Sequence, residues 1–327
     1  MENLIIDSSA SSTWSKHYSA WAIYDDFCLS HNIKGWPADY KAARAFATWA
    51  LTTRNLKANT VKSYISSIGF KNSLCNFPDP CLLSDKIVKL ILKGGQNRSL
   101  VQPSSELIKL SVNTHMLRVL GHRIAVSNWS PLSQQIVWTA FVTCFFSACR
   151  MGELVSDNDK NFDPRKTLKW SDLDFNVPDG MLMFLPYTKS KGAKGEMIDL
   201  FFYNSANFCP VSNLISLRCL LLQHNLYDIS NPVFMFKSGR FLTKKILNGI
   251  LDRMLSDMFD NKRFKVTCHS FRTGIPTLLD SLGTRHGEDI KEWGRWASNS
   301  VGLYTRNVRE RRKTIYDNIL NVLSDSL

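Results

Sequence analysis

Residues 267–306 read TCHSFRTGIPTLLDSLGTRHGEDIKEWGRWASNSVGLYTR, and we expect the fold to be organised around this stretch. His269 and Arg272 are three residues apart, so in a helix both side chains leave the same face and can reach one ligand. An imidazole and a guanidinium on one face favour an anionic ligand. The stretch therefore predicts an anion-binding site.

A tyrosine lies near the end of the same stretch. Tyr304 follows Ser298 and Asn299, either of which can cap a short helix that presents the phenol, and Arg306 comes two residues later. A phenol with its ordinary pKa of about 10 is a poor nucleophile at neutral pH unless a base or cations stabilise its developing charge. Guanidinium groups that hold a phosphate supply such cations.

The composition is that of a basic, globular chain. Its 327 residues give room for two domains of ordinary size, and 44% of them are hydrophobic. Lys and Arg number 41 against 28 Asp and Glu, a formal charge of +13 that favours a polyanionic partner through counterion release. Many basic proteins bind no nucleic acid, so plain solubility remains the alternative explanation of the charge.

The eight cysteines include no Cys-x-x-Cys pair, and several lie in apolar runs such as FVTCFFSACR. They indicate buried, reduced thiols of an intracellular protein, with zinc binding a remote option. No acidic cluster or His/Cys ligand set predicts a metal or a cofactor. The opening MENLIIDSSASS lacks the features of a signal peptide, and residues 137–149 are too few to span a bilayer, so we expect a soluble protein with no membrane partner.

The first third of the chain predicts a small helical domain. Apolar periodicity indicates four short helices within residues 1–95, the last of them ending at Gly94-Gly95. Residues 96–106 have no hydrophobic period and are expected to form a linker. The first helix carries a stripe that we expect to be core rather than a base-stacking surface, namely Trp14, Tyr18, Trp21 and Ala22, continuing to Phe27 and Cys28.

Residues 107–327 predict a larger domain in which a long apolar helix, beginning at Pro131, ends at an arginine. An arginine in that position is costly to bury unless an anion or a carboxylate meets it. Arg150 either forms an ion pair with Glu153, three residues later, or holds a phosphate while Glu153 supports it.

Three strand-like runs follow, within residues 168–175, 181–187 and 197–202, and the sequence between them predicts turns. The second turn, TKSKGAKG, carries several lysines, and such a turn is usually a solvated one. These lysines are Lys189, Lys191 and Lys194.

His-Ser-Phe-Arg at residues 269–272, followed by Gly-Arg-Trp at 294–296 and then Tyr304, resembles the C-terminal signature of tyrosine recombinases, the phage-integrase type of DNA strand-transfer enzyme. The sequences Gly-Arg-Trp-Ala-Ser and Leu-Tyr-Thr-Arg are most similar to those found in recombinases of DIRS-like and Crypton-like mobile elements. The resemblance predicts an arginine box upstream, and Ala-Cys-Arg-Met-Gly-Glu-Leu at 148–154 matches it, with Cys149 inserted before the arginine.

The resemblance implies a mainly α fold with a small antiparallel β-sheet (α+β). Residues 1–95 would be a helical core-binding, DNA-binding domain, residues 96–106 the linker and residues 107–327 the catalytic domain. The C-terminal helix, with its apolar Ile315 and Ile319, either packs in cis or docks on a neighbouring subunit. The implied partners are double-stranded DNA and further copies of the chain, as a homo-tetramer on two DNA sites. The implied location is the nucleus for a eukaryotic mobile element and the cytoplasm otherwise.

The resemblance also implies a role for each site residue. Arg150 and Arg272 would clamp the scissile phosphate, and Tyr304 would attack it to form a 3′-phosphotyrosyl intermediate. Lys189, which follows Thr188 on the second turn, fits the position of the family's catalytic lysine and would protonate the leaving 5′ oxygen. His269 would help the phenol to lose its proton. No metal ion takes part.

One position departs from the family pattern. In most relatives a histidine or tryptophan directly follows the glycine and lies nine residues before the nucleophile, whereas Arg295 fills that position here and Trp296 lies eight residues before Tyr304. Either side chain can donate to a phosphate, Arg295 through its guanidinium or Trp296 through its indole N–H. We expect Trp296 to do so, with burial in the core as the alternative.

Three classes of function remain open: a site-specific recombinase or integrase of a mobile element, a relaxing enzyme similar to type IB topoisomerases, and a domesticated DNA-binding protein without catalysis. A short N-terminal bundle and an apolar C-terminal helix favour the recombinase, because they offer small modular contacts. The basic side chains expected at the DNA are Lys57, Lys62, Lys191, Lys194, Lys262, Arg263, Lys265 and Arg306.

Overall fold

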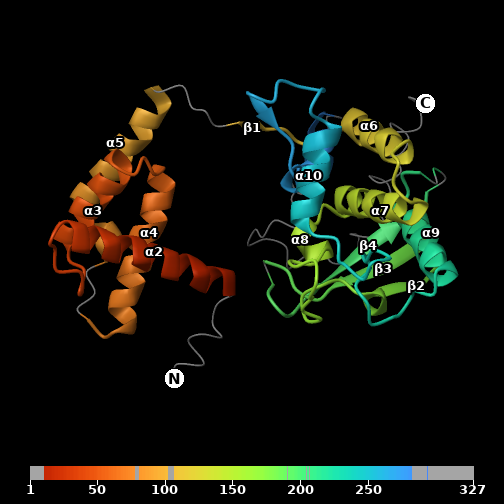
Figure 1. The fold of residues 1–327 in the computed structure, drawn as a ribbon, viewed down its shortest axis with the longest axis horizontal. Helices are drawn as coiled ribbons and strands as arrows, with labels where there is room; N and C mark the ends of the chain where they lie inside the picture. The colour runs from red at the N-terminus through yellow and green to blue at the C-terminus, as the bar shows by residue number, and fades with distance from the viewer. Residues whose placement is uncertain are drawn as a thin grey trace. The chain divides into compact units, whose positions relative to one another are not determined.

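The computed structural model describes residues 11–77, 81–101, 107–189, 191–203, 205, 207–281 and 293. The chain divides into two compact units, Met1–Ser105 and Glu106–Leu327, which are coloured from red to orange and from yellow to blue in Figure 1. None of the helices in these ranges has both the length and the apolar character needed to cross a membrane.

The first unit is a bundle of four helices, as the apolar periodicity predicts. Capping sets the starts of the second and fourth helices, since the Asp39 carboxylate accepts from the backbone N–H of Ala42 at 2.7 Å and the Asp85 carboxylate accepts from that of Val88 at 2.8 Å. One core, which includes Tyr24 and Phe46, lies between the helices. The helices are α2 (Ser11–Ser30), α3 (Tyr40–Thr52), α4 (Ala58–Leu74) and α5 (Lys86–Val101), with the short 3-10 turn η1 (Leu82–Ser84) between the last two.

Helix α5 shows that the expected helix end at Gly94-Gly95 is wrong, because the helix continues to Val101, well into the segment predicted as a linker. A glycine inside a helix costs about 0.5–1 kcal/mol. The structure gives Gly95 a packing role, since a Cβ at this position would lie 2.8 Å from the Leu51 side chain of α3. The glycine therefore allows α3 and α5 to approach each other closely.

The prediction for α2 is confirmed at Phe27 and Cys28, which are buried, and is wrong at Tyr18 and Ala22, which are exposed. The buried face of this helix also contains Ala20 and Tyr24, so it is rotated around the helix from Trp14, Tyr18 and Trp21. Tyr18 is 58% exposed. Rings of the stripe pack on one another instead, and Trp14 also contacts Phe70 of α4, with ring centroids 5.9 Å apart.

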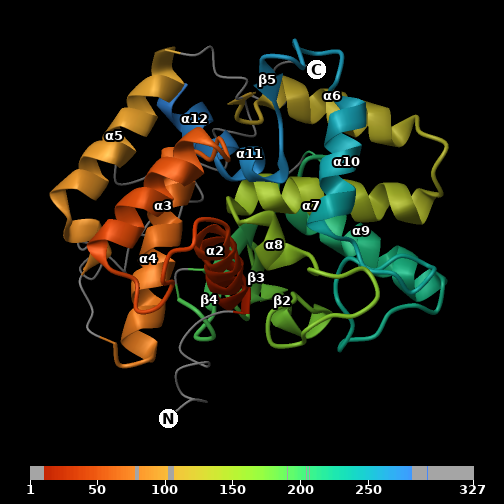
Figure 2. The same ribbon diagram turned by 60° about the vertical axis from the view of Figure 1, so that its left-hand side comes forward.

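The second unit is built around α7 (Pro131–Ser147). Pro131 stands in its first turn and the Ser130 hydroxyl caps it. Nearly every residue from Ile136 to Ser147 is buried, because α7 lies between α6 on one side and the three-stranded sheet on the other (Figures 1 and 2). The surrounding helices are α6 (Thr114–Ala125), α8 (Met151–Leu154), α9 (Pro210–Gln223), α10 (Lys244–Met254), α11 (Cys268–Arg272) and α12 (Gly274–Ser281).

Two small sheets complete this unit. The antiparallel sheet has the order β2 (Leu173–Val177), β3 (Gly180–Leu185), β4 (Glu196–Phe201), which confirms the expected hairpin arrangement. The first strand begins later than predicted, since residues 170–172 form a 3-10 turn whose first residue, Trp170, is buried. The second sheet, a parallel pairing of β1 (Ile108–Lys109) with β5 (Phe264–Lys265), was not predicted from the sequence.

The cysteines are all free, and five of the eight are buried as expected. The expectation of burial is wrong for Cys75, Cys81 and Cys219, which are exposed. Cys75 directly follows the last residue of α4, and Cys219 lies on the outer side of α9, so neither position faces a core.

Replacement of Gly274 by alanine is expected to lower the free energy of unfolding by about 1–3 kcal/mol, because the added Cβ would lie 2.6 Å from the carbonyl oxygen of Val112 and from the ring of Phe145. The matched control is Gly249→Ala in α10, where a Cβ meets nothing within 4 Å and alanine is the better helix former. Urea unfolding of both variants measures the difference. Equal midpoints for the two would contradict the close packing at Gly274.

Candidate active site

Arg150 lies at the surface just after the end of α7. Ala148 adopts a left-handed backbone conformation, with φ of 47°, and stops the helix. Cys149 is fully buried, and Arg150, which follows in an extended conformation, is the N-cap residue of α8. The Arg150 side chain is 32% exposed although the residues on both sides of it are buried. The turn at Ala148 therefore places a guanidinium at the edge of an apolar core.

Glu153 holds Arg150 in this position. One carboxylate oxygen accepts from the backbone N–H of Arg150 and the other from its guanidinium, both at 2.9 Å. The Glu153 side chain is only 6% exposed, so this carboxylate is nearly withdrawn from water. The predicted ion pair is thus confirmed as a contact. A guanidinium has five N–H donors, so the pair leaves donors of Arg150 for a further ligand.

Arg272 meets the same turn from α11. Its side chain is 2% exposed, and its Nη1 donates to the carbonyl oxygen of Ala148 at 3.1 Å. The helix is held against α7 by the ring of Phe271, which stacks on that of Phe141 with centroids 4.9 Å apart and an interplanar angle of 8°. Two arginines from distant parts of the sequence are therefore fixed around one turn of backbone.

His269 completes a cationic cluster. The side chain is exposed, yet its pKa is lowered, first by partial burial and then by the positive charges of Arg272, Lys109, Lys244 and Arg150. The structure thus brings together His269, Arg150 and Arg272. It adds Lys109 and Lys244, which the sequence interpretation missed, because neither a single lysine in a short strand nor the Lys244-Lys245 pair at the start of a helix forms a motif.

The predicted turn lysines differ from one another in their contacts. The turn is closed by Thr188, whose backbone exchanges hydrogen bonds with Gly192 and whose hydroxyl accepts from the backbone N–H of Lys191 at 3.1 Å. The Lys191 ammonium forms an ion pair with Glu196 at 3.0 Å. Lys189 is exposed, and no ion pair joins it to any described residue. No contact links Lys189 to the arginines within the ranges that the structure covers.

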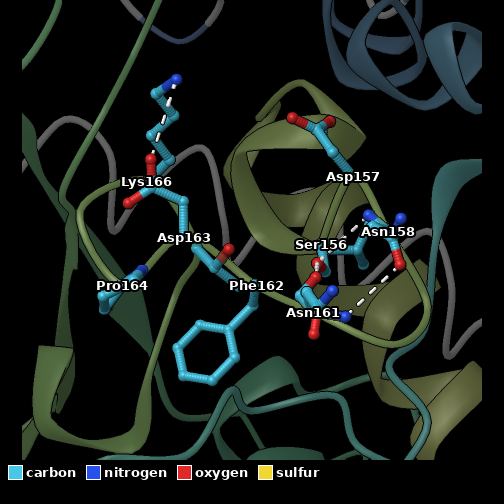
Figure 3. A pocket seen from close by; sticks show the side chains of 11 residues that line it. Ser156, Asp157, Asn158, Asn161, Phe162, Asp163, Pro164 and Lys166 are labelled. Carbon is cyan, nitrogen blue, oxygen red and sulfur yellow. Dashed lines mark hydrogen bonds and ion pairs between the residues drawn. The ribbon is translucent and has the colours of Figure 1, made fainter.

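One cavity of this unit lies beside α8 and does not contain the cationic cluster. It measures about 480 Å³, and residues 155–167 form most of its wall (Figure 3). Its charged lining includes Asp157 and Asp163, and the second of these is paired with Lys166. The cavity is not lined by Arg150, His269 or Arg272. The carboxylates of Asp157 and Asp163 in its wall disfavour the binding of a phosphate.

The remaining basic candidates lie elsewhere. Lys262 and Arg263 are exposed in the turn before β5, and Lys265 is half-buried within that strand. Lys194 is exposed in the β3–β4 turn. In the first unit, Lys57 lines a groove of about 450 Å³ between α3, α4 and α5, and Lys62 lies on the exposed side of α4.

Four predicted residues, Arg295, Trp296, Tyr304 and Arg306, lie outside the described part of the chain. The described residue closest to them in sequence is Trp293, whose indole N–H donates to the carbonyl oxygen of Phe146 on α7 at 3.1 Å. Trp293 is 6% exposed. The sequence interpretation missed this anchor, which ties Trp293 to the helix that ends at the Ala148 turn.

Comparison with solved structures shows the fold of the tyrosine recombinases. A lambda integrase tetramer bound to a Holliday junction is 12% identical and superposes with a TM-score of 0.55 over 91% of this chain and 76% of that one. XerH site-specific recombinase bound to palindromic difH substrate is 18% identical, with a TM-score of 0.51 over 89% and 72% of the two chains. No family model and no curated protein matches the sequence.

Glu153→Ala is expected to lower the free energy of unfolding by about 1–3 kcal/mol, because it leaves the Arg150 backbone N–H and guanidinium without their acceptor. Glu153→Gln keeps an acceptor oxygen and should cost less. The control is Asp163→Ala, which removes solvent-exposed pairs with Arg165 and Lys166 and a hydrogen bond from the Arg165 backbone, and should cost about 0–1 kcal/mol. Chemical denaturation compares the three, and a Glu153→Ala loss no larger than that of the control would refute the supporting role.

Acid should destabilise the second unit through His269. Its folded-state pKa lies below the ordinary value of about 6.5, so the unfolded chain takes up a proton first as the pH falls through that range, and stability decreases. NMR titration of the imidazole should give a lowered pKa that rises toward the ordinary value in Arg150→Gln. An unchanged pKa in this variant would show that Arg150 does not act on His269.

Proposed function

We propose that this chain, which has the fold of the tyrosine recombinases, cuts and rejoins DNA with Tyr304 as the nucleophile. The observation that carries the proposal is the arginine pair at the end of α7. The buried guanidinium of Arg272 donates to the Ala148 carbonyl, and Arg150 leaves the same turn two residues later. Guanidinium groups bind phosphate through charge-assisted and often bidentate hydrogen bonds, so a pair fixed in this way is suited to a phosphodiester.

In the proposed reaction the phenolate oxygen of Tyr304 attacks the phosphorus of the scissile phosphate. The bond from phosphorus to the 5′ oxygen breaks, which leaves a 3′-phosphotyrosyl link and a 5′-hydroxyl. Arg150 and Arg272 neutralise the charge that develops on the non-bridging oxygens, and Glu153 keeps Arg150 in place. Arg295 or Trp296 supplies a further donor to the same phosphate.

Two proton transfers accompany this step. His269 accepts the proton of the phenol, and its lowered pKa supports this role because the imidazole is then neutral at physiological pH. Lys189 donates a proton to the departing 5′ oxygen. Its ammonium has no carboxylate partner in the described part of the chain, whereas Lys191 is engaged by Glu196, which favours Lys189 over its neighbour. Attack by a second 5′-hydroxyl reverses both transfers and reseals a strand without ATP.

The biological role that we propose is integration or excision of a mobile element. The amino-acid sequence around Trp296 and Tyr304 resembles that of DIRS-like and Crypton-like recombinases. The lambda integrase to which the chain is similar in structure was solved as a tetramer on a Holliday junction. We accordingly propose a homo-tetramer on two DNA sites, monomeric or dimeric off DNA. Lys57, Lys62, Lys194, Lys262, Arg263, Lys265 and Arg306 would contribute backbone contacts.

Covalent trapping on nicked suicide duplexes that carry candidate element ends tests the proposal. In EDTA the wild-type chain should form an adduct that migrates slowly on a denaturing gel, on the strand bearing the 3′-phosphate. Tyr304→Phe should form none, because it lacks the attacking oxygen. Tyr316→Phe removes a hydroxyl twelve residues further along and should form the adduct as the wild type does.

Two other outcomes would redirect the assignment. Intact duplex binding with no adduct on any end would leave a DNA-binding protein without catalysis. Relaxation of supercoiled plasmid by the wild type in EDTA, with no joining of strands from two duplexes, would favour a relaxing enzyme that resembles type IB topoisomerases.

A further inference from the structure

Two lysines beside His269 have no assigned role. Lys109 lies in β1 and Lys244 is the first residue of α10, and both are exposed. Their charges, with those of Arg150 and Arg272, act on the imidazole of His269. These lysines therefore share the surface from which His269 faces solvent.

Backbone contacts fix both lysines in this place. Strand β1 pairs with β5 in parallel register, with Leu110 donating to the carbonyl of Lys265 at 3.0 Å, and Val112 donates to that of Ser270 at the same distance. The chain from Lys109 onward thus runs alongside the segment that contains His269.

The start of α10 is tied to α11 by two contacts. The thiol of Cys268 donates to the carbonyl oxygen of Lys244 at 3.7 Å. The backbone N–H of Cys268 donates to the Asn248 side chain at 2.9 Å. Since Cys268 directly precedes His269, the first turn of α10 is held next to the imidazole, and Lys244 with it.

The positive charges around His269 repel one another when no anion is bound. Lys109 is the register partner of Lys265, so two like charges stand on neighbouring strands, an arrangement that opposes pairing. Within the described residues, the carboxylate paired with this group of cations is that of Glu153, which is bound to Arg150, and the charge of Asp252 acts on the neighbouring thiol of Cys268. No ion pair joins Lys109 or Lys244 to a described residue. An anion between these lysines would relieve the repulsion.

We propose that Lys109 and Lys244 bind the DNA backbone phosphates that adjoin the scissile phosphate, as a second phosphate site beside His269. This inference rests on the proposed function, because it takes the phosphate at Arg150 and Arg272 as part of a continuous strand. Such a strand presents one charge about every 3.4 Å along the helix axis, so a ligand seated at the arginines brings further phosphates to the neighbouring cations. The additional site favours a polynucleotide over an isolated phosphate ester.

The test compares Lys109→Gln, Lys244→Gln and the double variant with Lys245→Gln. All three lysines are exposed, so these substitutions should leave the fold intact. Lys245 is one residue further along α10 and therefore about 100° around the helix from Lys244. Fluorescence anisotropy of a labelled duplex across a range of salt concentrations gives the slope of log affinity against log salt. Each of the first two substitutions should make the slope shallower by about 0.9, the double variant by about twice that, and Lys245→Gln should leave it unchanged.

NMR titration of His269 without DNA is the second readout, with His269→Gln used to assign its signal. The pKa of His269 should rise in Lys109→Gln and Lys244→Gln and stay constant in Lys245→Gln. If Lys109→Gln and Lys244→Gln keep the wild-type slope of log affinity against log salt, the second phosphate site is ruled out, even if the pKa of His269 rises. A wild type that binds no duplex at low salt would overturn the proposed function along with it, and the two failures are thus distinguishable.

Discussion

The guanidinium of Arg272 is buried and donates to the carbonyl of Ala148, the left-handed residue at which α7 stops. A non-glycine residue in this conformation costs about 1–2 kcal/mol, and a buried charge costs more unless a partner meets it. The two costs are linked, because the left-handed turn exposes the Ala148 carbonyl oxygen. The hydrogen bond to this oxygen offsets part of the cost of burying the Arg272 guanidinium. The position of Arg150 depends on this turn, and the position of α11 depends on Arg272.

Helix α7 supplies the rigidity behind this contact. It is apolar on every side, so it must be enclosed, and α6, α9, the antiparallel sheet and α11 all pack against it. The stacked rings of Phe141 and Phe271 join α7 to α11, and the indole of Trp293 bonds to Phe146 near the same end. A charged site can be held to within small tolerances when the elements that carry it share one packed core.

The residues around the cationic cluster of Arg150, His269 and Arg272 also determine its charge. Burial raises the pKa of the Cys268 thiol to about 12, so the residue next to His269 adds no negative charge at physiological pH. Glu153 is the acidic group that meets the arginines, and both of its oxygens are used by Arg150. Positive charge thus predominates around His269, where Glu153 pairs with Arg150 and Asp252 acts on the neighbouring Cys268 thiol, as a site for a phosphodiester requires.

The sequence alone determined the elements whose signals are local. Apolar periodicity and capping residues predicted the bundle of the first unit, α6 from Asn113, α7 from Pro131 and the three-stranded sheet, and motif spacing selected Arg150, His269 and Arg272 as candidates. Local signals failed at Gly95, where packing against Leu51 outweighs the low helix propensity of glycine, and on α2, where the buried face is set by the neighbouring helices.

Only the tertiary structure decided which charges share a surface. The pairing of β1 with β5 and the contact of Cys268 with the start of α10 bring Lys109 and Lys244 to His269. The Ala148 carbonyl meets Arg272 across a long separation in sequence. Each of these contacts joins segments that have no local pattern in common, and their free energy comes from burying surfaces that the chain brings together only when it is folded.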